Sequence, residues 1–414
     1  MAQKSRVRWL QVGDLNTKFF HYVVNANRKR NSLNGLVLNN LWVEEPMIIK
    51  EHIKSFFQER FSEEHGMRPR LDGVCFQQLN QEQRQKLSRR FDEDEIRAAV
   101  WDCDSDKCPG PDGINFKFIK DFWEVLKNDI VPFVQQFYDN AKLPKGTNSS
   151  FISLISKVDN LVKLNEYRPI SLVGCMYKIL AKTLARRLKV VLPALVDERQ
   201  MAFMEVLVNG SPTKEFQMQK RIRQGDPLAP LLFVLVAEGL TGLVREATKK
   251  NLFSGVVVGS RMVPVDVLQY ADDTIFIGEA NLDNVKTMKV ILRCFELVSG
   301  LKVNFAKSSL GGVGVNTEVM ISYAEQIHCK LSPIPFQYLG IPIGANPRRC
   351  TTWQPVIRKC SKKLSTWRAS SLSIAGKVCL INSVLTSLPL YFMSFYTTVF
   401  IVVVCFCDSR PILS

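Results

Sequence analysis

Short runs of apolar and polar positions predict several β-strands. Residues 265–280, VDVLQYADDTIFIGEA, contain two apolar arms that flank two adjacent acids, Asp272 and Asp273. The arms are rich in Val, Ile, Phe and Tyr, which fit the pleated surface of a sheet. Each arm therefore predicts a strand, and Ala271–Asp273 predicts the turn of a β-hairpin. Phe151–Val158, FISLISKV, predicts a further strand.

Helical spacing follows a loop that is rich in Pro and Gly at residues 109–113. Apolar residues then recur at intervals of three or four, which predicts a helix with one buried face. These residues are Phe118, Phe122, Leu126, Ile130, Val134 and Phe137. Residues 167–196 predict a short extended piece and then a helix with Arg186, Arg187 and Lys189 towards its end.

Two loop signals complete the pattern. Val206–Gln219 predicts a hairpin with an Asn-Gly turn. In RQGDPLAP a loop leads into a helix, for which Asp226 suits the N-cap and Pro227 the first helical position. Because strands and helices alternate irregularly, we expect an α+β fold.

Charge narrows the choice of partners. The 414 residues carry 55 Lys and Arg against 39 Asp and Glu, a net charge of +16, and the pI is near 9.4. Such a balance suits a polyanion, most simply nucleic acid, although a basic protein without such a partner has the same composition. Residues 1–35 interleave basic and aromatic side chains, which hold phosphates and stack on bases or form a solvated helix face. They include Arg6, Arg8, Trp9, Lys18, Phe19, Phe20 and the run Asn27–Asn31.

The eleven cysteines are scattered and form no Cys-x-x-Cys pair. We therefore expect reduced thiols in an intracellular protein, nuclear or cytoplasmic, without a disulfide framework or a zinc site. The first residues are basic and lack an apolar signal core. Leu390–Cys407 is uncharged, nearly all apolar and close to a membrane-spanning length. A membrane anchor is the less favoured reading of this tail; a buried segment or a tail without a selected fold is the alternative.

Asp272 and Asp273 have two interpretations. Aspartate is common in turns because its side chain hydrogen-bonds to its own backbone. Alternatively, two neighbouring carboxylates at a rigid tip repel each other unless a cation neutralises them, which indicates a divalent metal site.

Six blocks in order resolve this choice through a resemblance. They are CPGPDGINFKFIK, YRPISLVGCMYKILAKTLARRL, RQGDPLAPLLFVLVAEGL, QYADD, GLKVNFAKSSL and YLGIPIG. Together they resemble the reverse transcriptases of non-LTR retrotransposons, most of all the plant LINE type, and the similarity extends to about Ser394. The resemblance implies a right-hand polymerase with fingers, palm and thumb. It implies a basic region at 1–95, fingers and palm at 96–345, a thumb-like region at 346–394 and an aberrant apolar tail at 395–414.

The resemblance also implies roles for individual residues. Nucleotidyl transfer uses two divalent ions about 4 Å apart, held by hard oxygen ligands. Asp272 would be the bridging ligand and Asp273 a supporting one for Mg²⁺, for which Mn²⁺ can substitute. Lys307 would face the leaving pyrophosphate. Residues that would contact nucleotide or template are Arg168, Gln224, Gly225 and Tyr270. Each role has a structural alternative. Arg168 would be a structural arginine, the loop RQGDPLAP would be a plain helix entry, and Lys307 would be an ordinary surface lysine.

One departure from the family is large. A third carboxylate belongs on a separate palm strand, in a block of the pattern Phe-x-Val-Asp, between DERQMAF and VLVNG. Here DERQMAF ends at Phe203 and VLVNG starts at Val206, so only Met204 and Glu205 lie between them. We expect a hairpin that lacks its neighbouring strand, and two strands alone are marginal in water. Asp197, Asp226 and Asp266 are not convincing replacements.

The functional expectation is therefore an RNA-directed DNA polymerase by family that is defective in this chain. The partners would be an RNA template, a DNA primer and deoxynucleoside triphosphates, with membrane association unlikely. The alternatives are a non-catalytic nucleic-acid-binding remnant and a protein tethered to a membrane by its tail.

Overall fold

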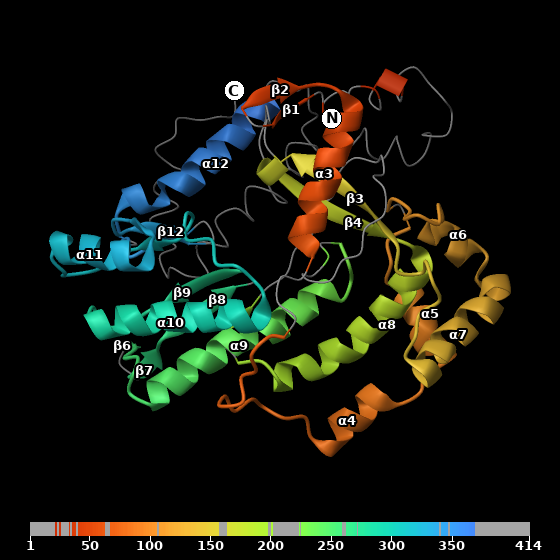
Figure 1. The fold of residues 1–414 in the computed structure, drawn as a ribbon, viewed down its shortest axis with the longest axis horizontal. Coiled ribbons are helices and arrows are strands. Elements are labelled where there is room, and N and C mark those ends of the chain that lie inside the picture. The colour runs from red at the N-terminus through yellow and green to blue at the C-terminus, as the bar shows by residue number, and fades with distance from the viewer. Residues whose placement is uncertain are drawn as a thin grey trace. The chain divides into compact units, whose positions relative to one another are not determined.

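The computed structural model describes most of the chain between residues 21 and 368. The described residues are 21–22, 25, 33, 35–38, 40–62, 67–105, 107–156, 164–197, 200–201, 223, 225–258, 262–270, 272–338, 341–346 and 348–368. The chain divides into two compact units, a larger one at 18–303 and a smaller one formed by 304–414 with 1–17. Figure 1 shows the helices and strands of both units.

Helices form the first half of the larger unit. They are α3 (Pro46–Phe61), α4 (Gln81–Ser88), α5 (Glu93–Trp101), α6 (Phe116–Asp121), α7 (Trp123–Asn140) and α8 (Cys175–Val191). Local sequence starts several of them, because Asn80, Asp92 and Asn115 each accept a backbone N–H at the N-terminus of α4, α5 or α6. Apolar residues of α5 to α8 form one core, which includes Ile96, Val100, Trp123, Val134 and Ile179.

Two hairpin-like pairs accompany these helices. β3 (Ser150–Ser156) and β4 (Tyr167–Val173) are antiparallel over their full length. The short strands β1 (Leu36–Leu38) and β2 (Leu41–Val43) are also antiparallel, and Leu36 is buried with Ile49 of α3 and Leu164.

The second half of the larger unit contains a three-stranded sheet, a second pair of strands and two long helices. The sheet has the order β5-β8-β9, with β5 (Gln200–Met201), β8 (Val267–Tyr270) and β9 (Asp273–Phe276). The pair is β6 (Val256–Val258) with β7 (Val263–Val265), and the helices α9 (Ala229–Lys249) and α10 (Leu282–Ser299) pack against each other. Short 3-10 turns lie at Leu164–Glu166 and Leu192–Ala194.

The smaller unit is described from residue 304 to residue 368 with gaps. It contains β10 (Ser309–Leu310), α11 (Thr317–Ile327), β11 (Lys330–Leu331), β12 (Phe336–Tyr338), β13 (Ile341–Ile343) and α12 (Cys350–Arg368). β10 pairs with β11 in parallel, and β12 pairs with β13 in antiparallel fashion. Trp353, Val356 and Cys360 form the buried side of α12.

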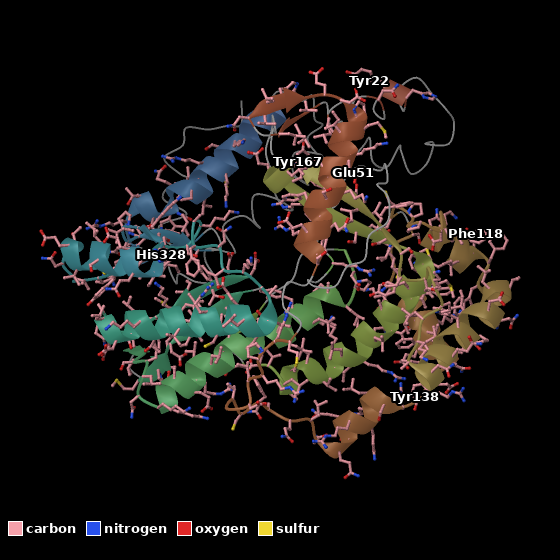
Figure 2. All side chains as sticks on the ribbon, viewed as in Figure 1. Tyr22, Glu51, Phe118, Tyr138, Tyr167 and His328 are labelled. Carbon is pink, nitrogen blue, oxygen red and sulfur yellow. The ribbon has the colours of Figure 1, made fainter. Side chains whose placement is uncertain are left out.

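The architecture is mixed helix and strand, so the α+β prediction is confirmed. The continuous helix predicted from Phe118 onward is wrong, because α6 ends at Asp121 and α7 begins at Trp123. Lys120 donates to the carbonyl oxygens of Trp101 and Cys103, which anchors α6 against the end of α5. As a result Phe118 on α6, labelled in Figure 2, is 45% exposed, whereas Ile130 and Val134 are buried as predicted.

The predicted start of the helix after RQGDPLAP is also wrong. α9 begins at Ala229, with Leu228 at the N-cap position and Pro230 in the first turn. Asp226 lies two positions before the N-cap residue, and its carboxylate accepts the backbone N–H of Leu228 at 2.9 Å. The other carboxylate oxygen of Asp226 is bonded to a distant side chain, described below.

No helix within the described residues is both long enough and apolar enough to cross a membrane. The apolar tail, the basic segment at 27–31, the predicted hairpin at 206–219 and the junction at 203–206 all lie outside the described residues. The eight cysteines that the structure describes are free thiols.

Candidate active site

Asp272 and Asp273 lie at the tip of the predicted hairpin. Tyr270 at the end of β8 pairs with Asp273 at the start of β9, so the paired residues are three positions apart in the sequence. Both aspartates are exposed. The hairpin is confirmed because its β-branched arms pair in register from Val267 opposite Phe276 to the tip.

The sequence led us to expect a hairpin of two strands alone, and this expectation is wrong because a third strand lies beside it. β5 pairs in parallel with β8, with Gln200 opposite Gln269 and Met201 opposite Tyr270. DERQMAF itself therefore supplies a short third strand beside the hairpin. Below the sheet, the hydroxyl of Thr241 on α9 donates to the buried Gln269 side chain at 2.7 Å, which fixes β8 against α9.

The electrostatics of the tip favour a cation. Partial burial raises the pKa of Asp273, and the neighbouring carboxylate of Asp272 raises it further. A divalent ion would offset this repulsion, and carboxylate oxygens are suitable ligands for Mg²⁺. The donor type therefore fits the ion. Within the described residues, however, no group of three or more His, Cys, Asp or Glu side chains is placed to hold a metal.

The loop before α9 is held against β4 and α8. Gly225 has φ of +101°, and a Cβ there would lie 2.7 Å from the carbonyl oxygen of Ser171. The neighbouring Asp226 is buried and accepts the Tyr177 hydroxyl at 2.5 Å. Arg223 donates to the Asn148 carbonyl at 3.0 Å and lies over the Tyr177 ring. Glycine is thus required here by the approach of strand β4.

The remaining predicted site residues belong to several different elements. Arg168 is exposed on β4, opposite Ile155 of β3. Tyr270 ends β8, but its side chain and all of Gln224 lie outside what the structure describes. Lys307 is exposed in the smaller unit, where its backbone N–H donates to the Asn304 carbonyl at 3.0 Å.

Three other acids, Asp197, Asp226 and Asp266, each have a different partner in the structure. Asp197 lies 3.5 Å from the Arg245 guanidinium, which also contacts the buried Glu238 at 3.3 Å. Asp226 is bonded to Tyr177, as above. Asp266 is buried between β7 and β8 and accepts the Thr248 hydroxyl at 3.4 Å.

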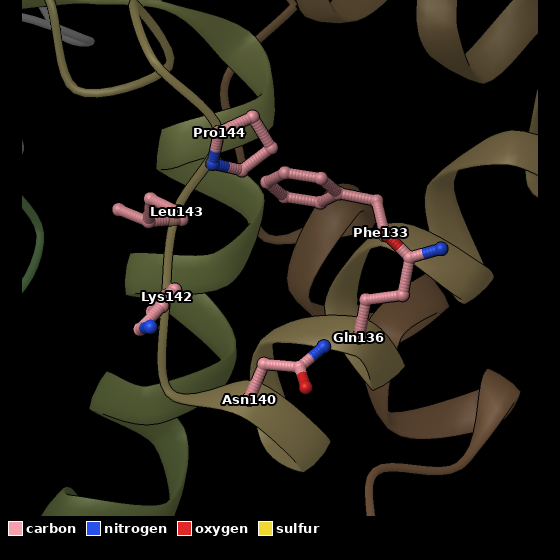
Figure 3. Close-up of a pocket in the computed structure, with 6 residues that line it drawn as sticks. All are labelled: Phe133, Gln136, Asn140, Lys142, Leu143 and Pro144. Carbon is pink, nitrogen blue, oxygen red and sulfur yellow. The ribbon is translucent and has the colours of Figure 1, made fainter.

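Sequence reasoning missed Tyr177 as the partner of Asp226. The two are 49 positions apart, and no local pattern connects them. It also missed a pocket of about 330 Å³ at the end of α7 (Figure 3). This pocket is lined by Phe133, Gln136, Asn140, Lys142, Leu143 and Pro144, none of which is a predicted site residue.

The site residues thus include a hairpin tip that carries two neighbouring aspartates and a Gly-containing loop before a long helix. Comparison with known proteins shows what this part of the chain is similar to. Residues 204–343 match the family described as reverse transcriptase (RNA-dependent DNA polymerase). This part of the chain is therefore similar to reverse transcriptases, and the matched region includes the Asp272–Asp273 hairpin.

Two of the three relatives described here are named for mobile elements. The chain is 22% identical to the transposon TX1 uncharacterized 149 kDa protein of Xenopus laevis, over 93% of this chain and 35% of the relative. It is 36% identical over 72 residues to an uncharacterized mitochondrial protein of Arabidopsis thaliana, 17% of this chain and 59% of that protein. It is 25% identical over 42% of its length to the retrovirus-related Pol polyprotein from type-1 retrotransposable element R2 of Popillia japonica, 24% of which is covered. The chain thus spans only part of each relative.

Proposed function

We propose that this chain is the reverse transcriptase region of a non-LTR retrotransposon of the plant LINE type, and that it has lost polymerase activity. The observation that carries the proposal is the hairpin with Asp272 and Asp273 at its tip, inside the reverse transcriptase match. The proposed substrates are an RNA template, a DNA primer and deoxynucleoside triphosphates. The two aspartates would hold Mg²⁺, or Mn²⁺, and this ion would stabilise the charge of the reacting phosphates.

Loss of activity follows from the junction between Phe203 and Val206, where only two residues separate the flanking blocks. The Xenopus relative supports a deletion. Its alignment covers 465 positions but takes in 93% of this chain, or about 385 of 414 residues. The relative therefore has roughly 80 residues within the aligned stretch that this chain lacks. That is enough for a strand with flanking helices.

A missing carboxylate strand affects catalysis through geometry. In-line phosphoryl transfer depends on fixed positions of the ions and of the reacting oxygens. With two carboxylates, a bound ion would take most of its ligands from water and would be less constrained. We expect the loss of a ligand-bearing strand to cost more activity than the truncation of one side chain.

The test is primer extension on an RNA template with Mg²⁺. Three proteins are compared: the chain as it is, a repaired chain with a Phe-x-Val-Asp strand and its flanking helices inserted between Phe203 and Val206, and the repaired chain with Asp272→Asn. We expect extension by the repaired chain alone. Asp72→Asn in the repaired chain is the matched control, because Asp72 is exposed and lies in a turn before α4.

One result would contradict the proposal directly. Robust extension by the chain as it is, abolished by Asp272→Asn, would show that another acid completes the metal site. The second candidate function, a nucleic-acid-binding protein without catalysis, rests on the +16 charge. Binding of RNA that weakens steeply with salt, in the absence of extension by the repaired chain, would favour it.

A further inference from the structure

One face of α8 is a continuous basic stripe formed by Lys178, Lys182, Arg186 and Lys189. The intervals of four, four and three residues place these side chains in one row. At 1.5 Å per residue the row is about 16 Å long. Figure 1 shows α8 alongside α5 in the larger unit.

The stripe contrasts with the rest of the helix. The opposite side of α8 is buried, through Ile179, Leu180, Thr183, Arg187 and Val191. Lys178 and Lys182 are half-buried. Lysines at such positions commonly pack their methylene stems on apolar surface and keep the ammonium group in water. Arg186 and Lys189 are exposed. The exposed residues of this helix are thus Arg186 and Lys189 together with Val190, which is 69% exposed.

The stripe has more positive charge than its surroundings neutralise. Among the described residues, the side chains of Lys178, Lys182 and Lys189 form no ion pair or hydrogen bond. Arg186 pairs with Asp102 at the end of α5. At the N-terminus of α8, the carboxylate of Asp112 accepts the backbone N–H of Cys175.

A fourth lysine increases the charge near the middle of the stripe. Lys120, Lys178 and Lys182 all lie close enough to Cys103 to lower its pKa, although burial has the larger effect and raises that pKa to about 11. Lys120 is held there by the carbonyl oxygens of Trp101 and Cys103. Elsewhere in this part of the larger unit, lysines such as Lys86, Lys117 and Lys127 are paired with carboxylates.

We propose that the basic stripe of α8 binds the phosphate backbone of single-stranded RNA. A row of unpaired ammonium groups on a rigid helix follows a polyanion without reading its sequence. This inference rests on the proposed function, because it assigns to the RNA partner a surface on the larger unit that is separate from the Asp272 hairpin.

The experiment measures binding of a fluorescein-labelled single-stranded RNA of about 20 nucleotides, longer than a common single-strand site, across a range of salt concentrations. The test variant is Lys178→Gln, Lys182→Gln and Lys189→Gln in the full chain. Each lysine that contacts phosphate contributes about 0.7 to the slope of log affinity against log salt for single strands. We expect the magnitude of this negative slope to become smaller by about 2 in the variant. Its affinity near 100 mM salt should fall roughly ten- to a hundredfold.

Two further variants separate contact from overall charge and from folding. Lys142→Gln, Lys145→Gln and Lys286→Gln removes three exposed lysines elsewhere in the same unit, and it should leave the slope nearly unchanged. Lys178→Arg, Lys182→Arg and Lys189→Arg retains the charge and should bind like the unmodified chain. Equal slopes for the stripe variant and the control would overturn the inference while leaving the proposed function intact. Absence of RNA binding by the unmodified chain would overturn both.

Discussion

The guanidinium of Arg187 connects α8 to α4 and α5, and its removal should destabilise the larger unit severely. Its side chain is 6% exposed and pairs with Glu95, which is 10% exposed. The pair is bidentate, with Nε to Oε1 at 2.7 Å and Nη2 to Oε2 at 2.8 Å. Three more bonds go to the carbonyl oxygens of Leu87, Arg89 and Arg90, and the guanidinium lies 4.0 Å above the ring of Phe91.

The variant Arg187→Met retains an apolar stem but leaves the largely buried Glu95 with only the exposed Arg89, whose guanidinium lies 3.8 Å away. Removal of one member of a buried ion pair costs about 3–5 kcal/mol. The carbonyl oxygens that lose their donor add to this cost, although water can reach some of them. We therefore expect the free energy of unfolding to fall by about 4 kcal/mol. Arg187→Lys retains the charge but loses the bidentate geometry, so its effect should be smaller.

Urea unfolding followed by tryptophan fluorescence is a suitable assay, because Trp123 lies in the same hydrophobic cluster as Phe91. The double variant Arg187→Met with Glu95→Leu removes both charges, and it should recover a large part of the lost stability. A loss below about 1 kcal/mol for Arg187→Met would refute the reasoning. So would a double variant less stable than Arg187→Met, since the damage would then come from lost packing rather than from an unpaired charge.

Two more predictions concern the candidate site. Gly225→Ala should lower the melting temperature clearly more than Gly113→Ala, because both glycines have positive φ but only at Gly225 does the added Cβ meet backbone, the Ser171 carbonyl at 2.7 Å. Equal shifts for the two variants would show that the loop moves away from β4 at little cost. The pKa of Asp273 is raised in the folded chain, so the folded chain binds the carboxyl proton more readily than the unfolded chain does. The contribution of this carboxyl to the free energy of unfolding is therefore fully present below pH 3.8 and is lost as the pH rises through the raised pKa. Asp273→Asn should therefore match the unmodified chain in acid and exceed it in stability at neutral pH without divalent ions. A constant difference across that pH range, measured by urea unfolding, would contradict the assigned repulsion.

The elements that were predicted correctly are those whose formation depends on the residues within them. The β-branched arms around Asp272 pair as expected because register in a hairpin follows from alternation and from a short connection. The strand predicted at Phe151–Val158 forms as β3, with bounds of Ser150–Ser156. The helix predicted after the extended piece YRPIS forms as α8, because its apolar spacing matches the helical period.

Long-range contacts determine the elements that were predicted wrongly. Asp226 has the residue type of an N-cap, but its carboxylate is bonded to Tyr177, 49 positions away. The periodicity of Phe118 and Phe122 continues that of α7, but the anchor of Lys120 on the end of α5 separates the two helices. Neither contact has a signature in the sequence around the residue.

The candidate site shows the same division. Adjacent acids between apolar arms are visible in the sequence, and the structure places both at one hairpin tip. The close approach of Gly225 to β4 is not visible, because it depends on a strand more than fifty positions earlier. The pairing of β5 with β8 was missed for a similar reason, since a two-residue strand has no periodicity of its own.

The engagement of the nearby acids explains why repair of the site requires a strand rather than one substitution. Asp197 would have to leave Arg245, Asp226 would have to leave the Tyr177 hydroxyl, and Asp266 would have to leave the interior between β7 and β8. The first move would leave Arg245 with Glu238 alone, and the other two would take the described acceptors from the half-buried hydroxyls of Tyr177 and Thr248, at a cost of about 1–3 kcal/mol for an unsatisfied group. A metal ion held by a displaced side chain would have to offset that cost and the strain of the shifted backbone as well. A new carboxylate on its own strand beside the hairpin avoids both costs, and for that reason the inserted strand is the decisive arm of the primer-extension experiment.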